Sequence, residues 1–188
     1  MANKKDIVKK IRSAVISVSD KSNLKPLLQT LNRYNVKLIS SGGTFKAIRK
    51  LGYRCLEVSD YTGFNEILDG RVKTLHPKIH AGILNKRNNN SHKREIKKNN
   101  FQNIDLVIVN FYPFEKTLNT TKNHNKIIEK IDIGGPALVR SAAKNYNDVT
   151  VITSINQYSA LIDQLKRFKG ATKLEFRKKL SQSAFNET

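Results

Sequence analysis

Short apolar, β-branched runs alternate along this chain with segments of helical periodicity. Strands are expected at 14–18, 36–39, 54–58, 106–109 and 149–152. Helices are expected between and after them, at 24–34, 44–51, 92–99, 125–131, 136–145, 155–168 and 173–185. The runs 106–109 and 149–152 are continuously apolar, which is typical of parallel strands buried on both faces. The alternation predicts an α/β fold of three layers, with a mainly parallel sheet flanked by helices.

The length of 188 residues suits a single domain with a short appendage. We expect residues 1–150 to form the core and residues 151–188 to add C-terminal helices. The single Cys55 cannot form an internal disulfide. The first residues lack the apolar stretch of a signal peptide, and no apolar run is long enough to span a bilayer. These observations predict a cytoplasmic protein that has no membrane partner.

The formal net charge of +20 favours anionic ligands. The lysines are scattered along the whole sequence, which indicates a general compositional bias. The denser clusters, at 4–12 and 86–98, lack interleaved aromatic residues and any nucleic-acid-binding motif. We therefore expect no nucleic-acid partner, whereas a small phosphorylated ligand fits the charge.

Polar segments follow the first two expected strands. Because ligands bind beyond the carboxyl ends of parallel strands, these segments are candidate site loops. Ser19, Asp20 and Lys21 precede a helix, where a phosphate would find a hydroxyl, a lysine and free backbone N–H groups. The alternative is that Ser19 or Asp20 only caps that helix.

The second polar segment contains Ser41, Gly42, Gly43 and Thr44. The two glycines allow close approach of the backbone, and the Thr44 hydroxyl is a candidate donor. The spacing matches neither a P-loop nor a dinucleotide-binding fingerprint, so a generic turn is the alternative. Two phosphate-type loops at successive strand ends favour a binding pocket.

Residues 70–82 combine Arg71 and Lys73 with His76 and His80. Gly70 and Pro77 bound a constrained loop that presents the two cations. The histidines have the i, i+4 spacing of a zinc pair, but Pro77 follows His76 directly and no third ligand accompanies them. We expect structural histidines and no metal site.

Two later segments supply further polar groups. Tyr112, beside Pro113, either presents its hydroxyl or packs in the core. Asp132 precedes a Gly-Gly-Pro sequence that opens a helix, since proline suits the first helical position. Lys144 lies on that helix, where it would form an acid–base pair if it faced Asp132, or else would belong to a solvated helix face.

Together these segments resemble the cyclohydrolase half of the bifunctional enzyme family that joins AICAR transformylase to IMP cyclohydrolase. The resemblance covers essentially the whole chain, and its most specific motif is GRVKTLHP at 70–77. It also rests on SVSDK at 17–21, SGGT at 41–44, YPF at 112–114, DIGGP at 132–136 and AAKN at 142–145. It implies a fold like that of methylglyoxal synthase and a homodimer.

The resemblance also implies a reaction, the closure of 5-formamidoimidazole-4-carboxamide ribotide (FAICAR) to IMP with loss of water. An amide is a poor nucleophile and hydroxide a poor leaving group, so this chemistry needs a proton acceptor, a proton donor and support for an oxyanion. It needs no metal or other cofactor. Backbone N–H groups at 133–135 are candidates for the oxyanion support.

The resemblance further implies which residues act. The catalytic positions would be Lys73, Tyr112, Asp132 and Lys144, with Lys144 favoured as the proton donor or acceptor. The substrate would contact Ser19, Asp20, Lys21, Ser41, Gly42, Gly43, Thr44, Arg71, Val72, Lys73, Thr74, Asn110, Asp132 and Ile133.

The sequence departs from the family pattern in two ways. Tyr146 stands where the family usually has a histidine after the Lys-Asn pair, and the transformylase half is absent. Formyl transfer is therefore not expected of these residues; a separate chain or a missing domain would carry it. The alternative function is a non-catalytic domain of the same fold that senses a phosphorylated ligand.

Overall fold

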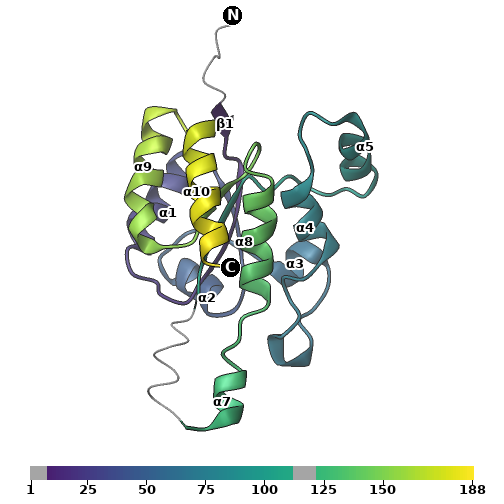
Figure 1. Cartoon of the computed structure of the whole chain (residues 1–188), viewed down its shortest axis with the longest axis vertical. Coiled ribbons are helices and arrows are strands. Elements are labelled where there is room, and N and C mark those ends of the chain that lie inside the picture. The colour runs from purple at the N-terminus through teal and green to yellow at the C-terminus, as the bar shows by residue number, and fades with distance from the viewer. Residues whose placement is uncertain (1–7, 112–121) are drawn as a thin grey trace, which may run out of the picture.

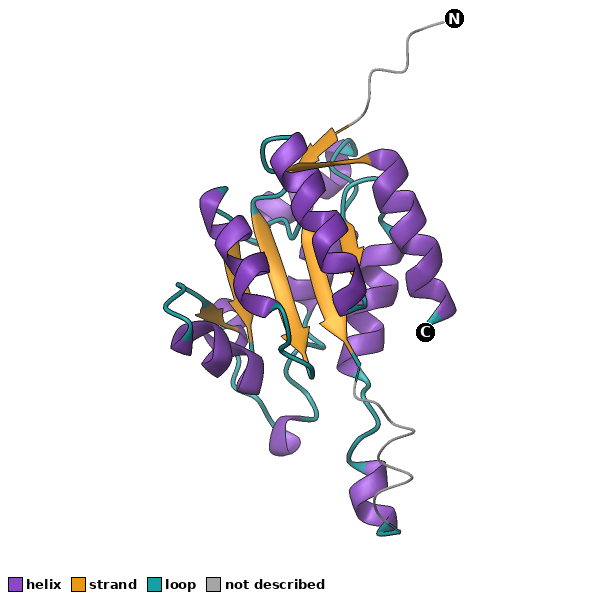
Figure 2. Cartoon of the chain, turned by 90° about the vertical axis from the view of Figure 1, so that its left-hand side faces the viewer, coloured by secondary structure: helices purple, strands orange, loops and turns teal. Residues whose placement is uncertain are grey.

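The computed structural model describes residues 8–111 and 122–188 of the chain, and a five-stranded sheet lies at its centre (Figure 1). The strand order is β4-β3-β2-β5-β6, and each neighbouring pair is parallel. The strands are β2 (Ser13–Val18), β3 (Lys37–Ser40), β4 (Leu56–Glu57), β5 (Leu106–Asn110) and β6 (Thr150–Ile152). Helices cover both faces of the sheet (Figure 2). The predicted α/β fold with a mainly parallel sheet is confirmed.

The helices pack in two groups around this sheet. On one side α8 and α10 contact β6, α8 also contacts β5, and α4 packs against α8; elsewhere α1 packs against α9. The helices are α1 (Leu24–Arg33), α2 (Gly42–Lys50), α3 (Val58–Thr62), α4 (Pro77–Leu84), α5 (Asn90–Lys98), α7 (His124–Ile128), α8 (Gly134–Lys144), α9 (Tyr158–Arg167) and α10 (Leu174–Asn186), with 3₁₀ turns η1 (Leu68–Gly70) and η2 (Ile155–Gln157).

The apolar pattern of the sequence explains the core. In β5, residues 106–109 are all buried, as expected for a strand covered on both faces. In α1 the buried face is formed by Leu24, Leu27, Leu28 and Leu31 at helical spacing. Burying each of these leucines contributes roughly 1.5–3 kcal/mol. The sheet is therefore a firm platform for the loops at its edge.

Several elements differ from the sequence expectation: the strand expected at 54–58 is reduced to β4, and α3 begins at Val58. A separate two-stranded antiparallel sheet pairs β1 (Val8–Lys10) with β7 (Ala171–Lys173). In addition, α4 begins at Pro77, inside the segment that was expected to be a loop. Pro77 occupies the start of the helix, and the His76 ring accepts a hydrogen bond from the Lys78 N–H at 3.1 Å. Proline therefore starts a helix here and does not interrupt one.

The C-terminal helices share the core of the rest of the chain. Strand β6 crosses the expected boundary at residue 150, and Leu161 and Leu180 belong to the same hydrophobic cluster as the sheet. Arg177 is completely buried and donates to the carbonyl oxygens of Thr172, Tyr146 and Asn147. These bonds tie α10 to the body of the domain. Within 8–111 and 122–188, no helix has the length and apolar character needed to cross a membrane.

Candidate functional site

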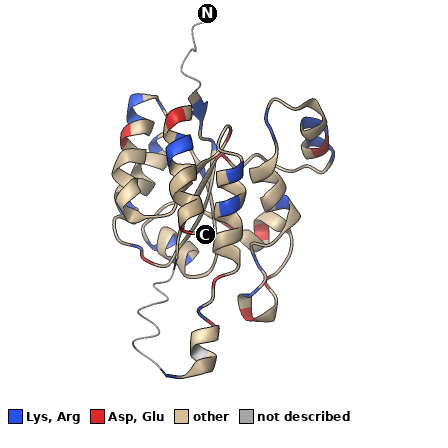
Figure 3. Ribbon diagram, in the orientation of Figure 1, with Lys and Arg blue, Asp and Glu red and all other residues tan. Residues whose placement is uncertain are grey.

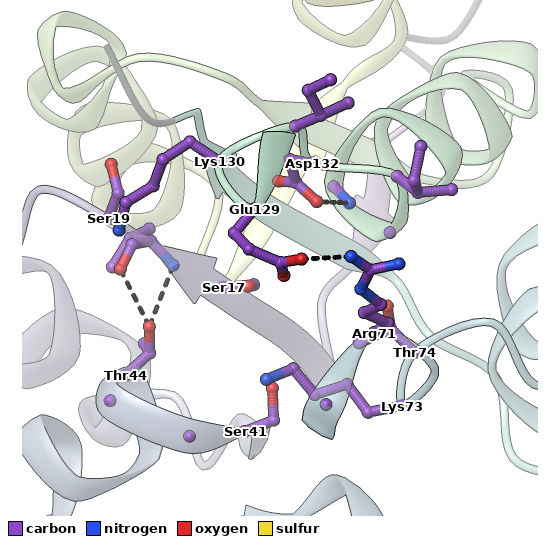
Figure 4. Close-up of a pocket in the computed structure, with 18 of the residues that line it drawn as sticks. Ser17, Ser19, Ser41, Thr44, Arg71, Lys73, Thr74, Glu129, Lys130 and Asp132 are labelled. Carbon is purple, nitrogen blue, oxygen red and sulfur yellow. Dashed lines mark hydrogen bonds and ion pairs between the residues drawn. The ribbon is translucent and has the colours of Figure 1, made fainter. Parts of the chain in front are cut away.

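A cavity of about 460 Å³ opens at the carboxyl ends of β2, β3 and β5 (Figure 4). Its wall includes Ser19, Ser41 and Asn110, from the three strand ends, and the N-termini of α2 and α8. The volume lies in the range of small-molecule sites. The loops that the sequence singled out at two strand ends therefore do meet, at the edge where parallel sheets bind ligands.

One end of the cavity is built around the N-terminus of α2. Ser41 has extended backbone angles, and Gly42 adopts a φ of 53°, in the left-handed region that favours glycine. The Lys73 Nζ lies 3.5 Å from the place that a Cβ on Gly42 would take, and the Lys21 Nζ lies 4.0 Å from the corresponding place on Gly43. Two ammonium groups thus flank a helix N-terminus, an arrangement that suits a phosphate.

Thr44 has a different role from the one expected. Its buried hydroxyl donates to the Val18 carbonyl at 2.9 Å and accepts from the Val18 N–H at 3.0 Å. The proton of this hydroxyl is therefore not available for donation to a ligand, although Thr44 does line the cavity. Instead, Thr44 fastens the first turn of α2 to the end of β2, which fixes the position of the anion-binding end.

Asn110 holds the loop after β2. Its Oδ1 accepts from the N–H groups of Ser19 (2.7 Å) and Asp20 (3.0 Å), and its Nδ2 donates to the Asp20 carbonyl at 2.9 Å. Asn110 and Ser19 line the cavity, whereas the Asp20 carboxylate accepts from the Ser22 N–H and does not line it. The amide that was expected to contact the base is thus largely engaged with this loop.

The other end of the cavity is formed by Asp132 and the start of α8. The Asp132 Oδ1 accepts a hydrogen bond from the Gly135 N–H at 2.8 Å. A Cβ at position 135 would overlap the second carboxylate oxygen, so only glycine permits this arrangement. Of the N–H groups expected to support an oxyanion, that of Gly135 is therefore already bound to Asp132. Ile133 also lines the cavity.

Two ion pairs bring carboxylates to the cationic side chains. Arg71 pairs with Glu129 across the cavity (Figure 4), and the Lys73 Nζ lies 3.7 Å from a carboxylate oxygen of Glu66. The hydrogen bond from Arg71 holds the pKa of Glu129 below its ordinary value. The guanidinium expected to bind substrate is thus paired with a residue that the sequence analysis did not select.

The sequence reasoning also missed other wall residues. These share segments with predicted ones, so their nearness in the chain to Asp132, Arg71 or Ser19 was the available indication. They are Ser17, Val18, Asp69, Gly70, Ile128, Glu129, Lys130 and Ile131, whereas Gly134 and Gly135 line the cavity within the segment expected to support an oxyanion. Thr74 was predicted and lines the cavity, but Val72 does not.

Lys144 lies far from the cavity within this chain. It is the last residue of α8, whose first residue, Gly134, lines the cavity. A helix rises 1.5 Å per residue, so the two Cα atoms are about 15 Å apart. Of the two alternatives for Lys144, pairing with Asp132 within one chain is therefore excluded, and the exposed side chain fits a solvated helix face. The remaining predicted catalytic residue, Tyr112, lies outside the described residues.

The two histidines have structural partners. The His76 ring caps α4, and the His80 Nδ1 lies 3.0 Å from the Ser141 Oγ. Burial lowers the pKa of His80, which favours its neutral form. In the part of the chain that the structure describes, no group of three or more His, Cys, Asp or Glu side chains is placed to hold a metal ion.

Comparison with known proteins gives a consistent result. The model of the MGS-like domain family matches residues 23–137, and that of the AICARFT/IMPCHase bienzyme family matches residues 142–188. Similar curated proteins are the bifunctional purine biosynthesis proteins PurH of Dinoroseobacter shibae, 48% identical over 95% of this chain, and of Prochlorococcus marinus, 52% identical over 93%. The chain spans only about a third of their length, 34% in each case. A crystal structure of ForH has a TM-score of 0.82 and 32% identity, with 94% of this chain and 92% of that chain covered.

Proposed function

This chain belongs to the MGS-like domain family and corresponds to the N-terminal part of the bifunctional purine biosynthesis proteins, and we propose that it is an IMP cyclohydrolase domain. In this proposal it closes FAICAR to IMP with loss of water. The observation that carries the proposal is a single cavity with an anion-binding end at α2 and a carboxylate, Asp132, held at the start of α8.

The anion-binding end accounts for recognition of the ribose phosphate. Lys21 and Lys73 flank the first turn of α2, where backbone N–H groups and two positive charges would meet the dianion. With the phosphate anchored there, the base extends towards Asp132 and Ile133. The loop that Asn110 secures forms the wall along the ribose.

Ring closure needs proton transfer at two atoms. The carboxamide nitrogen attacks the formyl carbon and loses one proton, while the formyl oxygen gains one and becomes a hydroxyl. Dehydration then removes that hydroxyl with a further proton as water. We assign Asp132 to these transfers from its place in the cavity, and Lys73, Tyr112 and Lys144 from the family resemblance.

The position of Lys144 connects catalysis to assembly. About 15 Å of helix separates it from the cavity wall at Gly134. We therefore propose that the domain acts as a homodimer in which Lys144 serves the cavity of the partner subunit. Formyl transfer belongs to the longer relatives, and we do not propose it for these residues.

The direct test is conversion of FAICAR to IMP by the purified chain, followed by ultraviolet absorbance. Lys73→Gln is expected to abolish turnover, whereas Lys93→Gln, on the exposed helix α5, is the matched control and is expected to leave turnover unchanged. A folded wild type that binds IMP but shows no turnover would contradict the proposal. That result would support a domain that only senses a phosphorylated ligand.

A further inference from the structure

The Arg71–Glu129 ion pair links two loops of the cavity wall, one of which carries Lys73 and the other Asp132. Arg71 precedes Lys73 by two residues, and Glu129 precedes Asp132 by three. One connection comes from the η1 side of the cavity and the other from the segment between α7 and α8. Figure 4 shows the two side chains meeting between these walls. The pair is therefore a bridge across the site.

We propose that Glu129 is a positioning residue, which holds Arg71 and thereby fixes the distance between Lys73 and Asp132. This inference rests on the proposed cyclohydrolase function. Glu129 itself takes no proton from the substrate and contributes no bond to it.

The surroundings of Glu129 explain why one ion pair has a large influence on position. Its neighbours Ile128 and Ile131 are 41% and 50% exposed, so little apolar packing holds this segment to the body. Helix α7 projects away from the sheet, at the bottom of Figure 1. Within 8–111 and 122–188, the contacts that tie this segment to the opposite wall include the pair with Arg71. Loss of the pair would let the connection, and with it Asp132, move.

The same pair has little influence on overall stability. The side chains of Arg71 and Glu129 are 60% and 58% exposed, and ion pairs in such positions contribute little to the free energy of unfolding. A structural role and a positioning role therefore predict different outcomes. Removal of the carboxylate should leave unfolding unchanged and reduce the catalytic rate.

A second interpretation makes Glu129 a competitor of the substrate phosphate. Its carboxylate lies among the cationic side chains of the cavity and would repel a dianion. However, the anion-binding end at α2 has its own cations, Lys21 and Lys73, and Glu129 is neutralised by Arg71. Competition predicts that Glu129→Gln lowers KM and leaves kcat unchanged. Positioning predicts that Glu129→Gln lowers kcat and leaves KM nearly unchanged.

The experiment compares Glu129→Gln with Glu95→Gln, a control that removes an exposed carboxylate from α5, away from the cavity. We expect kcat to fall by up to about fivefold in Glu129→Gln, the most that an exposed ion pair can supply, with little change in KM or in the unfolding midpoint. Glu129→Asp should recover part of the rate. Because about 1 M salt screens exposed charges, it should lower the kcat of the wild type towards that of Glu129→Gln. The double variant Arg71→Gln/Glu129→Gln should have the same kcat as Arg71→Gln alone.

An activity-independent measurement separates this inference from the proposed function. Exchange of the backbone amide hydrogens at 127–135 should be faster in Glu129→Gln than in Glu95→Gln. If the wild type has no turnover, the proposed function fails and this exchange still tests the bridge. Unchanged exchange, or a kcat equal to that of Glu95→Gln, would overturn the inference. A lower KM with unchanged kcat would establish competition instead.

Discussion

A chain with Lys73→Ala and a chain with Lys144→Ala are each expected to be inactive alone and to restore activity to each other in a mixed dimer. The reason is the geometry of α8, which begins at the cavity with Gly134 and ends at Lys144. At 1.5 Å per residue the separation is about 15 Å, more than an extended lysine side chain spans. Within one chain, Lys144 cannot reach a substrate beside Asp132.

The expected rate of the mixture follows from the fraction of cavities in which both lysines are intact. Random pairing makes about half of the dimers mixed, and each mixed dimer has one cavity in which both lysines are intact. The mixture should therefore show about a quarter of the wild-type rate per chain. If Lys144 acted within its own chain, each cavity of a mixed dimer would lack one lysine and the mixture would be inactive.

The assay uses the two variants refolded together, with the dimer isolated by gel filtration before FAICAR is added. The reverse control mixes wild type with the double variant Lys73→Ala/Lys144→Ala. Action across the interface predicts about a quarter of the wild-type rate, because only wild-type homodimers are active, whereas action within one chain predicts about half. An inactive first mixture together with half activity in the control would refute the reasoning.

Three further predictions concern other parts of the molecule. Arg177→Met should lower the free energy of unfolding by about 3 kcal/mol or more in urea titrations, because it leaves the buried carbonyl oxygens of Thr172, Tyr146 and Asn147 without their donor; equal stability would contradict this. Gly135→Ala should displace Asp132 and reduce kcat while the circular dichroism spectrum stays native, since a Cβ there overlaps the carboxylate. Burial raises the pKa of the Cys55 thiol to about 11, so a much smaller fraction is the reactive thiolate at pH 8, and alkylation at that pH should be about a hundredfold slower in the folded protein than in urea.

The sequence predicted the fold well because its apolar pattern matches the layers. The strands β2, β3, β5 and β6 fall where β-branched runs stand, and the buried face of α1 follows its leucine spacing. The sheet of β1 and β7 was missed because each strand is only three residues long and has no apolar alternation to reveal it. Helix α4 was missed because Pro77 was interpreted as part of a loop.

The site was predictable in its segments but less so in its contacts. Chain order places Ser19, Ser41 and Asp132 after strands or before helices, and the structure brings them to one cavity. Which hydroxyl remains available depends on tertiary packing: Thr44 is committed to the end of β2 through hydrogen bonds that no local pattern reveals. The partner of Arg71 lies 58 positions further along the chain, beyond any sequence spacing rule.

The net charge of the whole chain should affect how fast a nucleotide associates, whereas the local charges of the cavity wall should affect which nucleotide is bound. The chain carries a net +20, and Figure 3 shows basic residues spread over many helices. The charged side chains of the cavity wall are nearly balanced, since Lys21, Arg71, Lys73 and Lys130 face Asp69, Glu129 and Asp132. A long-range positive field raises the rate at which an anionic nucleotide arrives, and salt screens it. Under the proposed function, discrimination between anions would depend instead on Lys21 and Lys73, beside the first turn of α2, and on hydrogen bonds at Asp132, which act at contact distance. Added salt should therefore slow association of the nucleotide much more than it alters the choice between nucleotides.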